Sequence, residues 1–456
     1  MALTSHSPET AHRTSSASGA YFGPLAVITT LFFIWGSLTS LNDVLIPYAQ
    51  QVFNLKIDAS MLIQTAFFSG YFLFSIPAAR IIDWIGYKRA ILVGLGLMII
   101  ACLMFYPAAK LPSFQFFLAA LIVLAIGITT LQVAANPFVA VLGDPKTASS
   151  RLNLTQAFNS LGTTIFPWIG AHLIMGTAVT AIAISATQQS NAVIRLYCYF
   201  FTVALLLLAI LIAVFRFPSV EAASHHVGET VEDSVWKHRN LVLGAVAIFV
   251  YVGAEVSIGS SIANYLALDK IGNLISPATI PDAAVRYRSA LGLAARYISL
   301  YWGGAMIGRF IGSAILQKMK SRHLLAACAT MAIALVLISV SSSGHVAMWS
   351  ILLVGFFNSI MFPTIFTLGI AELGPLTGDG SGILNMAIVG GAIIPLLVGK
   401  VAEMINHSYY PAMSQGETSW GNGIQYALLI PVLCYCYILF YGVSGAKSNS
   451  ERHLKA

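Results

Sequence analysis

The chain has 456 residues, of which 57% are apolar and only 9% are charged. Because soluble globular proteins carry about 25% charged residues, this composition excludes a soluble domain and predicts a protein that lies in a lipid bilayer. The net charge of +7 then reports where Lys and Arg lie relative to the membrane, and it does not indicate a nucleic-acid partner.

Long apolar runs follow a Ser-, Thr- and His-rich segment, residues 1–22, which we expect to be a cytoplasmic tail. A helix that crosses a hydrocarbon core of about 30 Å needs about 20 apolar residues. Runs of this length lie near 23–49, 59–82, 90–109, 114–142, 152–176, 194–216, 240–267, 293–317, 323–341, 346–371, 380–405 and 424–446. The sequence therefore predicts an all-α integral membrane protein with twelve transmembrane helices.

The twelve spans divide into two sets of six around a polar stretch at 217–239, which we expect to be a cytoplasmic linker. An internal repeat supports this division. Pro137-x5-Gly143 in the fourth span recurs as Pro363-x5-Gly369 in the tenth, and Gly162-x4-Pro167 in the fifth recurs as Gly390-x4-Pro395 in the eleventh. We therefore expect two six-helix repeats at 23–216 and 240–446, followed by a cytoplasmic tail at 447–456, as in transporters built from a duplicated half.

The distribution of Lys and Arg predicts the orientation of the chain. If the N-terminus is cytoplasmic, only seven of the 24 basic residues lie in outside loops: Lys56, Lys110, Arg195, Lys270, Arg286, Arg288 and Arg296. Two more, Arg309 and Lys400, lie within spans, and the other 15 lie on the inside. The positive-inside rule therefore places both termini in the cytoplasm.

Two carboxylates lie inside predicted spans, Asp43 in the first and Glu255 in the seventh. A charge in hydrocarbon costs about 2.5 kcal/mol or more, so each needs a partner, a water-filled cavity or a function. Asp43 is either a functional carboxylate or an interfacial residue near the outer headgroups. Glu255 is either a ligand-binding or cation-coupling group or one side of a structural pair. Arg309 in the eighth span is either its partner in that pair or a clamp between helices.

Amide side chains form a second set inside the membrane. Gln132 and Asn136 are spaced i, i+4 in the fourth span, and Gln156 and Asn159 are spaced i, i+3 in the fifth, so each pair shares one helix face. Single amides in other spans are Asn42, Gln64, Asn358 and Asn385. Amides both donate and accept hydrogen bonds, so the set suits a neutral polyhydroxylated ligand, although amide bonding between helices is the alternative for any one of them.

No motif points to an enzyme. The five cysteines, which we expect to be buried packing residues, show no metal-ligand spacing, and no nucleophile and base pair or phosphate-binding loop occurs in the cytoplasmic loops. We therefore expect no metal and no cofactor.

Six segments together resemble one branch of the major facilitator superfamily, the fucose–proton symporters and the glucose/galactose permeases. They are Leu41-Asn42-Asp43-Val44-Leu45-Ile46-Pro47, Ala134-Ala135-Asn136-Pro137-Phe138, Arg151-Leu152-Asn153-Leu154-Thr155-Gln156-Ala157-Phe158-Asn159-Ser160, Tyr251-Val252-Gly253-Ala254-Glu255-Val256, Gly308-Arg309-Phe310-Ile311-Gly312 and Phe362-Pro363-Thr364-Ile365-Phe366. The resemblance covers nearly all of residues 25–445. The superfamily's cytoplasmic motif between the second and third spans is similar to Asp83-Trp84-Ile85-Gly86-Tyr87-Lys88-Arg89, with Trp84 where an Arg is usual.

The resemblance implies roles for several residues. Asp43 matches the carboxylate that the fucose symporters use for cation coupling, whereas Gln132 stands where they have a second acid and Glu255 where they have a Gln. This exchange favours the glucose/galactose branch. The resemblance also implies a conformational gate on the cytoplasmic side that includes Asp83, Gly86, Lys88 and Arg309.

The resemblance therefore implies a secondary active transporter that imports a hexose, glucose or galactose, by symport with H⁺ or Na⁺. Asp43 and Glu255 are the predicted coupling residues, and the predicted sugar-binding residues are Asn42, Gln132, Asn136, Gln156, Asn159, Glu255, Asn358 and Asn385. We expect a monomer in a bacterial inner membrane. The alternatives are a symporter of fucose or another monosaccharide, a drug or lipid exporter on the same fold, and a sugar sensor that does not transport.

Overall fold

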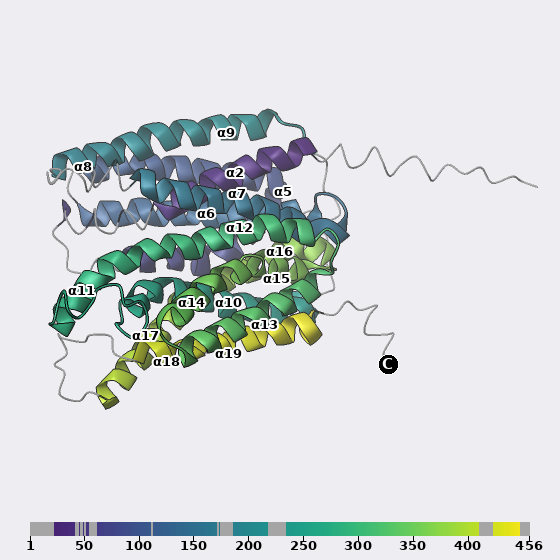
Figure 1. Cartoon of the computed structure of the whole chain (residues 1–456). Coiled ribbons are helices and arrows are strands. Elements are labelled where there is room, and N and C mark those ends of the chain that lie inside the picture. Colours follow the sequence, from purple (N-terminus) through teal and green to yellow (C-terminus); the bar gives the residue numbers. More distant parts are fainter. Residues whose placement is uncertain are drawn as a thin grey trace, which may run out of the picture.

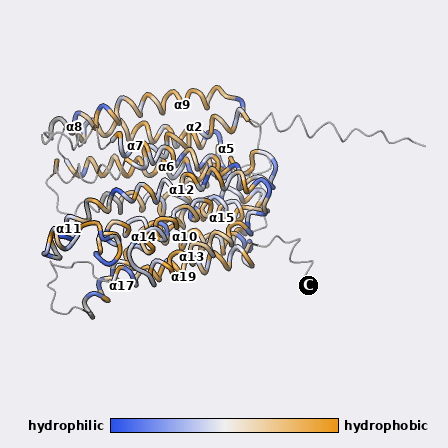
Figure 2. Tube along the Cα trace, in the orientation of Figure 1, coloured by the Kyte–Doolittle hydropathy of each residue, from blue (hydrophilic) through white to orange (hydrophobic). Residues whose placement is uncertain are grey.

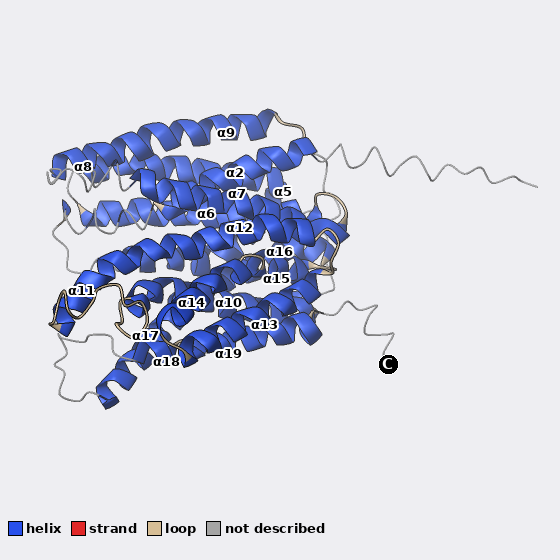
Figure 3. Ribbon diagram, in the orientation of Figure 1, coloured by secondary structure: helices blue, strands red, loops and turns tan. Residues whose placement is uncertain are grey.

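The protein is described by a computed structural model that places residues 22–41, 62–110, 113–170, 186–217, 234–409 and 423–446, together with Leu45, Ala49, Val52, Phe53 and Leu173. Every regular element within these residues is helical, and they contain no strand (Figure 3). The predicted tails and most of the predicted linker lie outside the described residues.

The first half of the chain forms one group of long helices. These are α2 (Phe22–Ser40), α5 (Leu62–Lys110), α6 (Phe114–Val141), η1 (Pro145–Thr147), α7 (Ala148–Gly170), α8 (Ala186–Val193), η3 (Ile194–Phe201) and α9 (Thr202–Val214). α5 contains two predicted spans, which are divided at Gly86. Its φ of 76° lies in the left-handed region that glycine adopts without strain.

The second half forms a similar group after η5 (Val235–Lys237). Its helices are α10 (Arg239–Leu266), α11 (Ala283–Ala294), η6 (Ala295–Tyr297), α12 (Ile298–Ile315), α13 (Ser321–Ser341), α14 (Gly344–Asn358), α15 (Met361–Ile370), η7 (Gly374–Leu376), α16 (Thr377–Met386), η8 (Ala387–Val389), α17 (Gly390–Tyr409), α18 (Gly423–Ala427), α19 (Leu429–Phe440) and η9 (Tyr441–Gly445). Figure 1 shows the two groups side by side, with α7 next to α12 and the start of α2 at the same end of the bundle as η9.

Nine helical stretches among the described residues are long and apolar enough to cross a membrane. One of them, Ala66–Lys110, holds the second and third predicted spans. α7 and α12 are not among the nine and complete the predicted twelve. Both carry polar side chains at the contact between the halves, which explains why α7 in particular is less apolar than an ordinary span.

The repeat predicted from glycine and proline spacing is visible in the packing of each half. A Cβ atom on Gly162 of α7 would lie 2.5 Å from the carbonyl oxygen of Phe33 in α2. A Cβ atom on Gly390, at the start of α17, would lie 2.0 Å from the carbonyl oxygen of Phe249 in α10. The first and fifth spans of each repeat therefore approach so closely that only glycine fits at the matching position.

The outer surface of the bundle is apolar, as Figure 2 shows along α9 and α19. On α9, Leu205 and Ile212 are buried, whereas Leu207 is 61% exposed. Such a surface suits lipid and would be unusual on a soluble protein. The expectation that all five cysteines are buried holds for Cys102, Cys198 and Cys434, whereas Cys328 is only partly buried. It is wrong for Cys436, which is exposed on α19 because that side of the helix faces away from the bundle.

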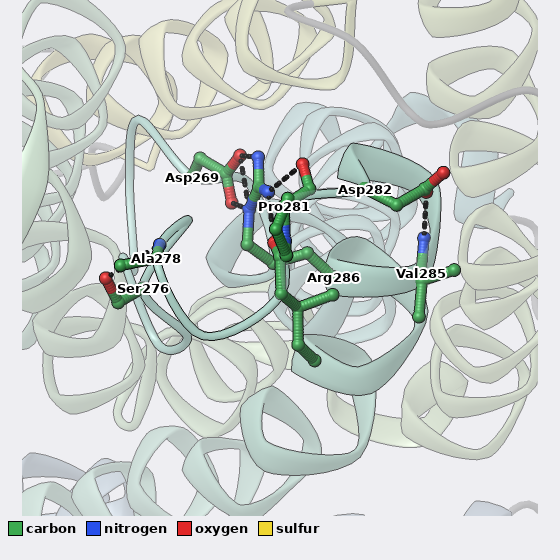
Figure 4. Close-up of polar contacts among 8 residues, drawn as sticks. Asp269, Ser276, Ala278, Pro281, Asp282, Val285 and Arg286 are labelled. Atoms are coloured by element: carbon green, nitrogen blue, oxygen red, sulfur yellow. Dashed lines mark hydrogen bonds and ion pairs between the residues drawn. The ribbon is translucent and has the colours of Figure 1, made fainter.

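The loop between α10 and α11 folds around Arg286 (Figure 4). The buried guanidinium donates from Nε to both oxygens of Asp269 at 2.9 and 3.0 Å, and from Nη1 to the carbonyl oxygens of Ile280 and Pro281 at 2.6 and 3.0 Å. The hydrogen bonds to Asp269 raise the pKa of Arg286 above its usual value. A bidentate pair with two further acceptors gives this loop one defined shape.

Candidate functional site

The amides of α6 lie in a buried network with one tyrosine. Gln132 donates from Nε2 to the hydroxyl of Tyr71 in α5 at 3.0 Å, and its Oε1 has no partner. Asn136 accepts at Oδ1 from Nε2 of Gln156 in α7 at 3.4 Å, and its Nδ2 has no partner. The structure therefore brings Gln132, Asn136 and Gln156 together in one half of the protein, as predicted from their helix faces.

Asn159 lies one turn further along α7 and contacts α2. Its Nδ2 donates to the carbonyl oxygen of Phe32 at 3.0 Å, and a Cβ atom on Gly36 would lie only 2.2 Å from the Asn159 carbonyl oxygen. In this conformation the amide of Asn159 therefore joins two tightly packed helices.

Glu255 and Asn358 occupy a second polar cluster, in the other half. The Asn358 side chain donates to the hydroxyl of Tyr301 at 2.8 Å, and its backbone carbonyl accepts from the hydroxyl of Tyr251 at 3.0 Å. The Tyr301 hydroxyl also lies 3.3 Å from the backbone carbonyl oxygen of Glu255. Both Oδ1 of Asn358 and Oε1 of Glu255 are buried without a hydrogen-bond partner.

Arg309 joins the two halves and does not form an ion pair with Glu255. Its Nε donates to the carbonyl oxygen of Ser359 at 3.1 Å, and its Nη1 donates to the hydroxyl of Ser160 and to the carbonyl oxygen of Gln156 in α7. The guanidinium lies close enough to attract the Glu255 carboxylate electrostatically. Of the two predicted arrangements for Arg309, the structure has the clamp between helices.

Asn385 lies on α16, where this helix crosses α6. Its Nδ2 donates to the backbone carbonyl oxygen of Ser381 at 2.9 Å, and its Oδ1 is buried without a partner. Ser381 in turn donates to the carbonyl oxygen of Val133 on α6 at 2.7 Å. α16 therefore contacts α6 beside Gln132.

Hydroxyl groups make further polar contacts between the halves. Ser150 in α7 and Ser313 in α12 bond reciprocally, because each hydroxyl donates to the backbone carbonyl oxygen of the other residue, at 2.7 and 3.0 Å. The hydroxyls of Ser149 and Thr367 lie 2.6 Å apart. These contacts are uncharged, and they lie between the ends of the halves that carry Lys146 and Lys318.

The motif at 83–89 lies at the same end. Asp83 faces the start of α16, since a Cβ atom on Gly378 would lie 3.1 Å from its Oδ1. Lys88 donates to the carbonyl oxygens of Ala213 and Phe215 at 2.8 and 3.1 Å. Lys88 thus caps α9 within its own half, whereas Asp83 faces the other half.

Two predicted site residues, Asn42 and Asp43, lie outside the described residues. Sequence reasoning also missed several groups that the structure places at the site: Tyr71, Tyr301, Ser160, Ser381 and the Ser150 and Ser313 pair. A tyrosine in an apolar run resembles ordinary packing until its hydroxyl partner is known. Among the described residues, no group of three His, Cys, Asp or Glu side chains is arranged to hold a metal ion.

The chain is similar to known proteins over most of its length. A family model described as Major Facilitator Superfamily matches residues 26–395. A glucose/galactose transporter of Brucella abortus is 46% identical, with 96% of this chain and 97% of that protein covered. The L-fucose-proton symporter of Escherichia coli is 33% identical, with 93% of each covered.

Solved structures agree with the sequence comparisons. The crystal structure of the Escherichia coli fucose:proton symporter FucP in the outward conformation is 31% identical and superposes with a TM-score of 0.77, covering 94% of this chain and all of that one. This match confirms the predicted twelve-helix fold. The chain therefore belongs to the Major Facilitator Superfamily.

Proposed function

We propose that the protein is a secondary active transporter that imports a hexose, glucose or galactose, by cation symport with alternating access. The observation that carries the proposal is the 46% identity to a glucose/galactose transporter over nearly the full length of both proteins. A putative glucose/galactose transporter of Helicobacter pylori, 39% identical over 94% of this chain, supports the same substrate class.

The buried amides support a sugar as the ligand. Gln132 and Asn136 each keep one polar atom without a partner, and so does Asn385 on the facing helix. An unpaired buried polar group costs about 1–3 kcal/mol, so such atoms suit a site in which a ligand supplies the missing hydrogen bonds. A neutral sugar has many hydroxyls and no charge to balance. We propose Asn42, Gln156, Asn159, Asn358 and Glu255 as further contacts of the bound sugar.

The contacts between the halves support alternating access. The Ser150 and Ser313 pair, the Ser149 and Thr367 pair and the Arg309 bonds all join α7 to the second half. We propose that these contacts, with Asp83, Gly86 and Lys88 in the adjoining motif, close the cytoplasmic side in this conformation and separate when sugar is released inside.

We propose Asp43 and Glu255 as the cation-coupling carboxylates. The relatives that are named L-fucose-proton symporters favour H⁺, and a carboxylate among neutral oxygens also suits Na⁺. No cofactor is needed, since the ion gradient supplies the free energy.

We further propose that the protein is a monomer of two halves, 23–216 and 240–446, in a bacterial inner membrane. The clustering of Lys and Arg supports cytoplasmic termini.

Counterflow into proteoliposomes tests the transport function and the substrate together. Vesicles are preloaded with unlabelled glucose, galactose or fucose, and the entry of dilute radiolabelled glucose is followed. We expect transient accumulation with glucose or galactose inside and much less with fucose inside. Stronger counterflow with fucose would overturn the choice of sugar, and no counterflow with any sugar would favour an exporter of apolar compounds.

A further inference from the structure

The two amides of α6 differ in which atom each leaves free. Gln132 uses its NH₂ group to bond the Tyr71 hydroxyl, so its oxygen remains as an acceptor. Asn136 uses its oxygen to accept from Gln156, so its NH₂ group remains as a donor. All four side chains are at least 93% buried. An isolated amide can both donate and accept hydrogen bonds. The network therefore orients the two amides so that the free atom is the oxygen in Gln132 and the nitrogen in Asn136.

The two free atoms belong to side chains that lie one helical turn apart on α6. Gln132 and Asn136 are four residues apart on a helix, so their side chains are neighbours on one face. A free acceptor beside a free donor matches two adjacent hydroxyls, one of which donates while the other accepts. Such a pair of hydroxyls is the repeating feature of a pyranose sugar.

α16 of the other half covers this turn of α6, because Ser381 donates to the carbonyl oxygen of Val133 at 2.7 Å. Neither free atom is exposed while this contact is made.

We propose that Gln132 and Asn136 form a directional subsite for a vicinal diol of the transported sugar, and that Tyr71 is the positioning residue that fixes its direction. The proposal rests on the sugar-transport function proposed above. In the subsite, one sugar hydroxyl donates to Oε1 of Gln132, and its neighbour accepts from Nδ2 of Asn136. Tyr71 does not touch the sugar and acts through the Gln132 amide.

A double-mutant cycle of Tyr71→Phe and Gln132→Glu tests the direction, with glucose affinity measured by calorimetry. Tyr71→Phe lets the amide turn and should weaken binding about fivefold, the typical effect of one lost hydrogen bond. Gln132→Glu keeps an acceptor in either orientation, so it should still bind glucose, and its own affinity is the reference for the second arm of the cycle. In the Gln132→Glu background, Tyr71→Phe should then cost almost nothing, because both carboxylate oxygens are acceptors. Tyr199→Phe, at an exposed tyrosine of η3, is the matched control.

Deoxy and fluoro glucoses provide a second measurement that does not depend on the variants. At the hydroxyl that donates to Gln132, the deoxy and fluoro sugars should lose equal affinity, because fluorine cannot donate. At the neighbouring hydroxyl, the fluoro sugar should retain part of the affinity, because fluorine accepts weakly from Asn136.

Three outcomes would overturn the subsite while leaving the transport function standing: loss of glucose binding in Gln132→Glu, an equal cost of Tyr71→Phe in both backgrounds, or no position at which the fluoro sugar outperforms the deoxy sugar. If the unmutated protein binds no hexose at all, the transport function fails first.

Discussion

Two carboxylates of the second half lie near an arginine, and their surroundings differ. Asp269, in the loop between α10 and α11, accepts three hydrogen bonds from Arg286, which also donates to two loop carbonyls. Glu255, inside the membrane, keeps one oxygen without a partner although Arg309 is near. Arg309 instead bonds α7 of the other half and the Ser359 carbonyl oxygen.

The difference separates a structural carboxylate from an available one. The bidentate pair in the loop between α10 and α11 belongs to one half and has no need to break during transport. A buried carboxylate that has no ion pair and keeps one oxygen without a hydrogen bond costs free energy, which is the expected condition of a group that binds a cation or a ligand. The contacts between the halves are mostly uncharged, and such bonds between helices are worth about 0.6 kcal/mol each, so they can open and close.

The largest effect is expected at Asp43, the proposed coupling carboxylate of the first half. Asp43→Asn removes the titratable or cation-binding group while keeping its size, so it should abolish gradient-driven accumulation and leave sugar exchange measurable. Paired accumulation and counterflow assays separate the two effects. Unchanged accumulation would instead show that Asp43 is an interfacial residue near the outer headgroups.

Glu255→Gln should have the next largest effect. Replacing the carboxylate removes charge-assisted hydrogen bonds to the ligand and should weaken glucose binding about tenfold, which corresponds to roughly 1.4 kcal/mol. Calorimetry measures the affinity, and thermal melting in detergent serves as the stability control. Intact binding with poor expression or early melting would make Glu255 a structural partner of Arg309.

Removing the reciprocal serine contact should shift the conformational equilibrium by a smaller factor. Ser150→Ala with Ser313→Ala deletes two neutral bonds, which predicts a shift of about sevenfold toward the state that is open to the cytoplasm. Spin-label distances between Lys146 and Lys318, both exposed, report this population in a cysteine-free background. The labelled pair Lys318 and Ala371 within one half is the control, and unchanged Lys146 to Lys318 distances would remove the serines from the gate.

The smallest effect on transport is expected in the loop between α10 and α11, which holds Asp269. Asp269→Asn breaks the ion pair with Arg286 and should lower the melting temperature by a few degrees while uptake changes less than twofold. Melting curves and initial uptake rates measure the two quantities on the same preparation. If uptake falls more than twofold while the melting temperature falls by only a few degrees, this loop takes part in transport and the contrast with Glu255 fails.

The helices were predictable because hydropathy determines them, and the errors have a physical cause. The fourth span was predicted at 114–142 and forms α6 at Phe114–Val141. The fifth was predicted to begin at residue 152, yet α7 begins at Ala148. Ser149 and Ser150 are too polar to count as apolar, and they are tolerated in the helix because their hydroxyls bond the other half.

The site was predictable only in part. Helix spacing placed Gln132 with Asn136 and Gln156 with Asn159, and the structure adds the contact between the two pairs. Spacing could not find Tyr71, because it is 61 residues from Gln132 in sequence and its ring suits any apolar span. Nor could it choose a partner for Arg309, since Glu255 and Ser160 are both polar and distant in sequence.

Accumulation of radiolabelled glucose in proteoliposomes tests symport most directly, with an inward proton gradient or an inward sodium gradient imposed separately. We expect one of these gradients to drive glucose inside to a concentration above that outside, and an ionophore that collapses the gradient to abolish the excess. Glucose that only equilibrates under both gradients would contradict symport, even if counterflow is present.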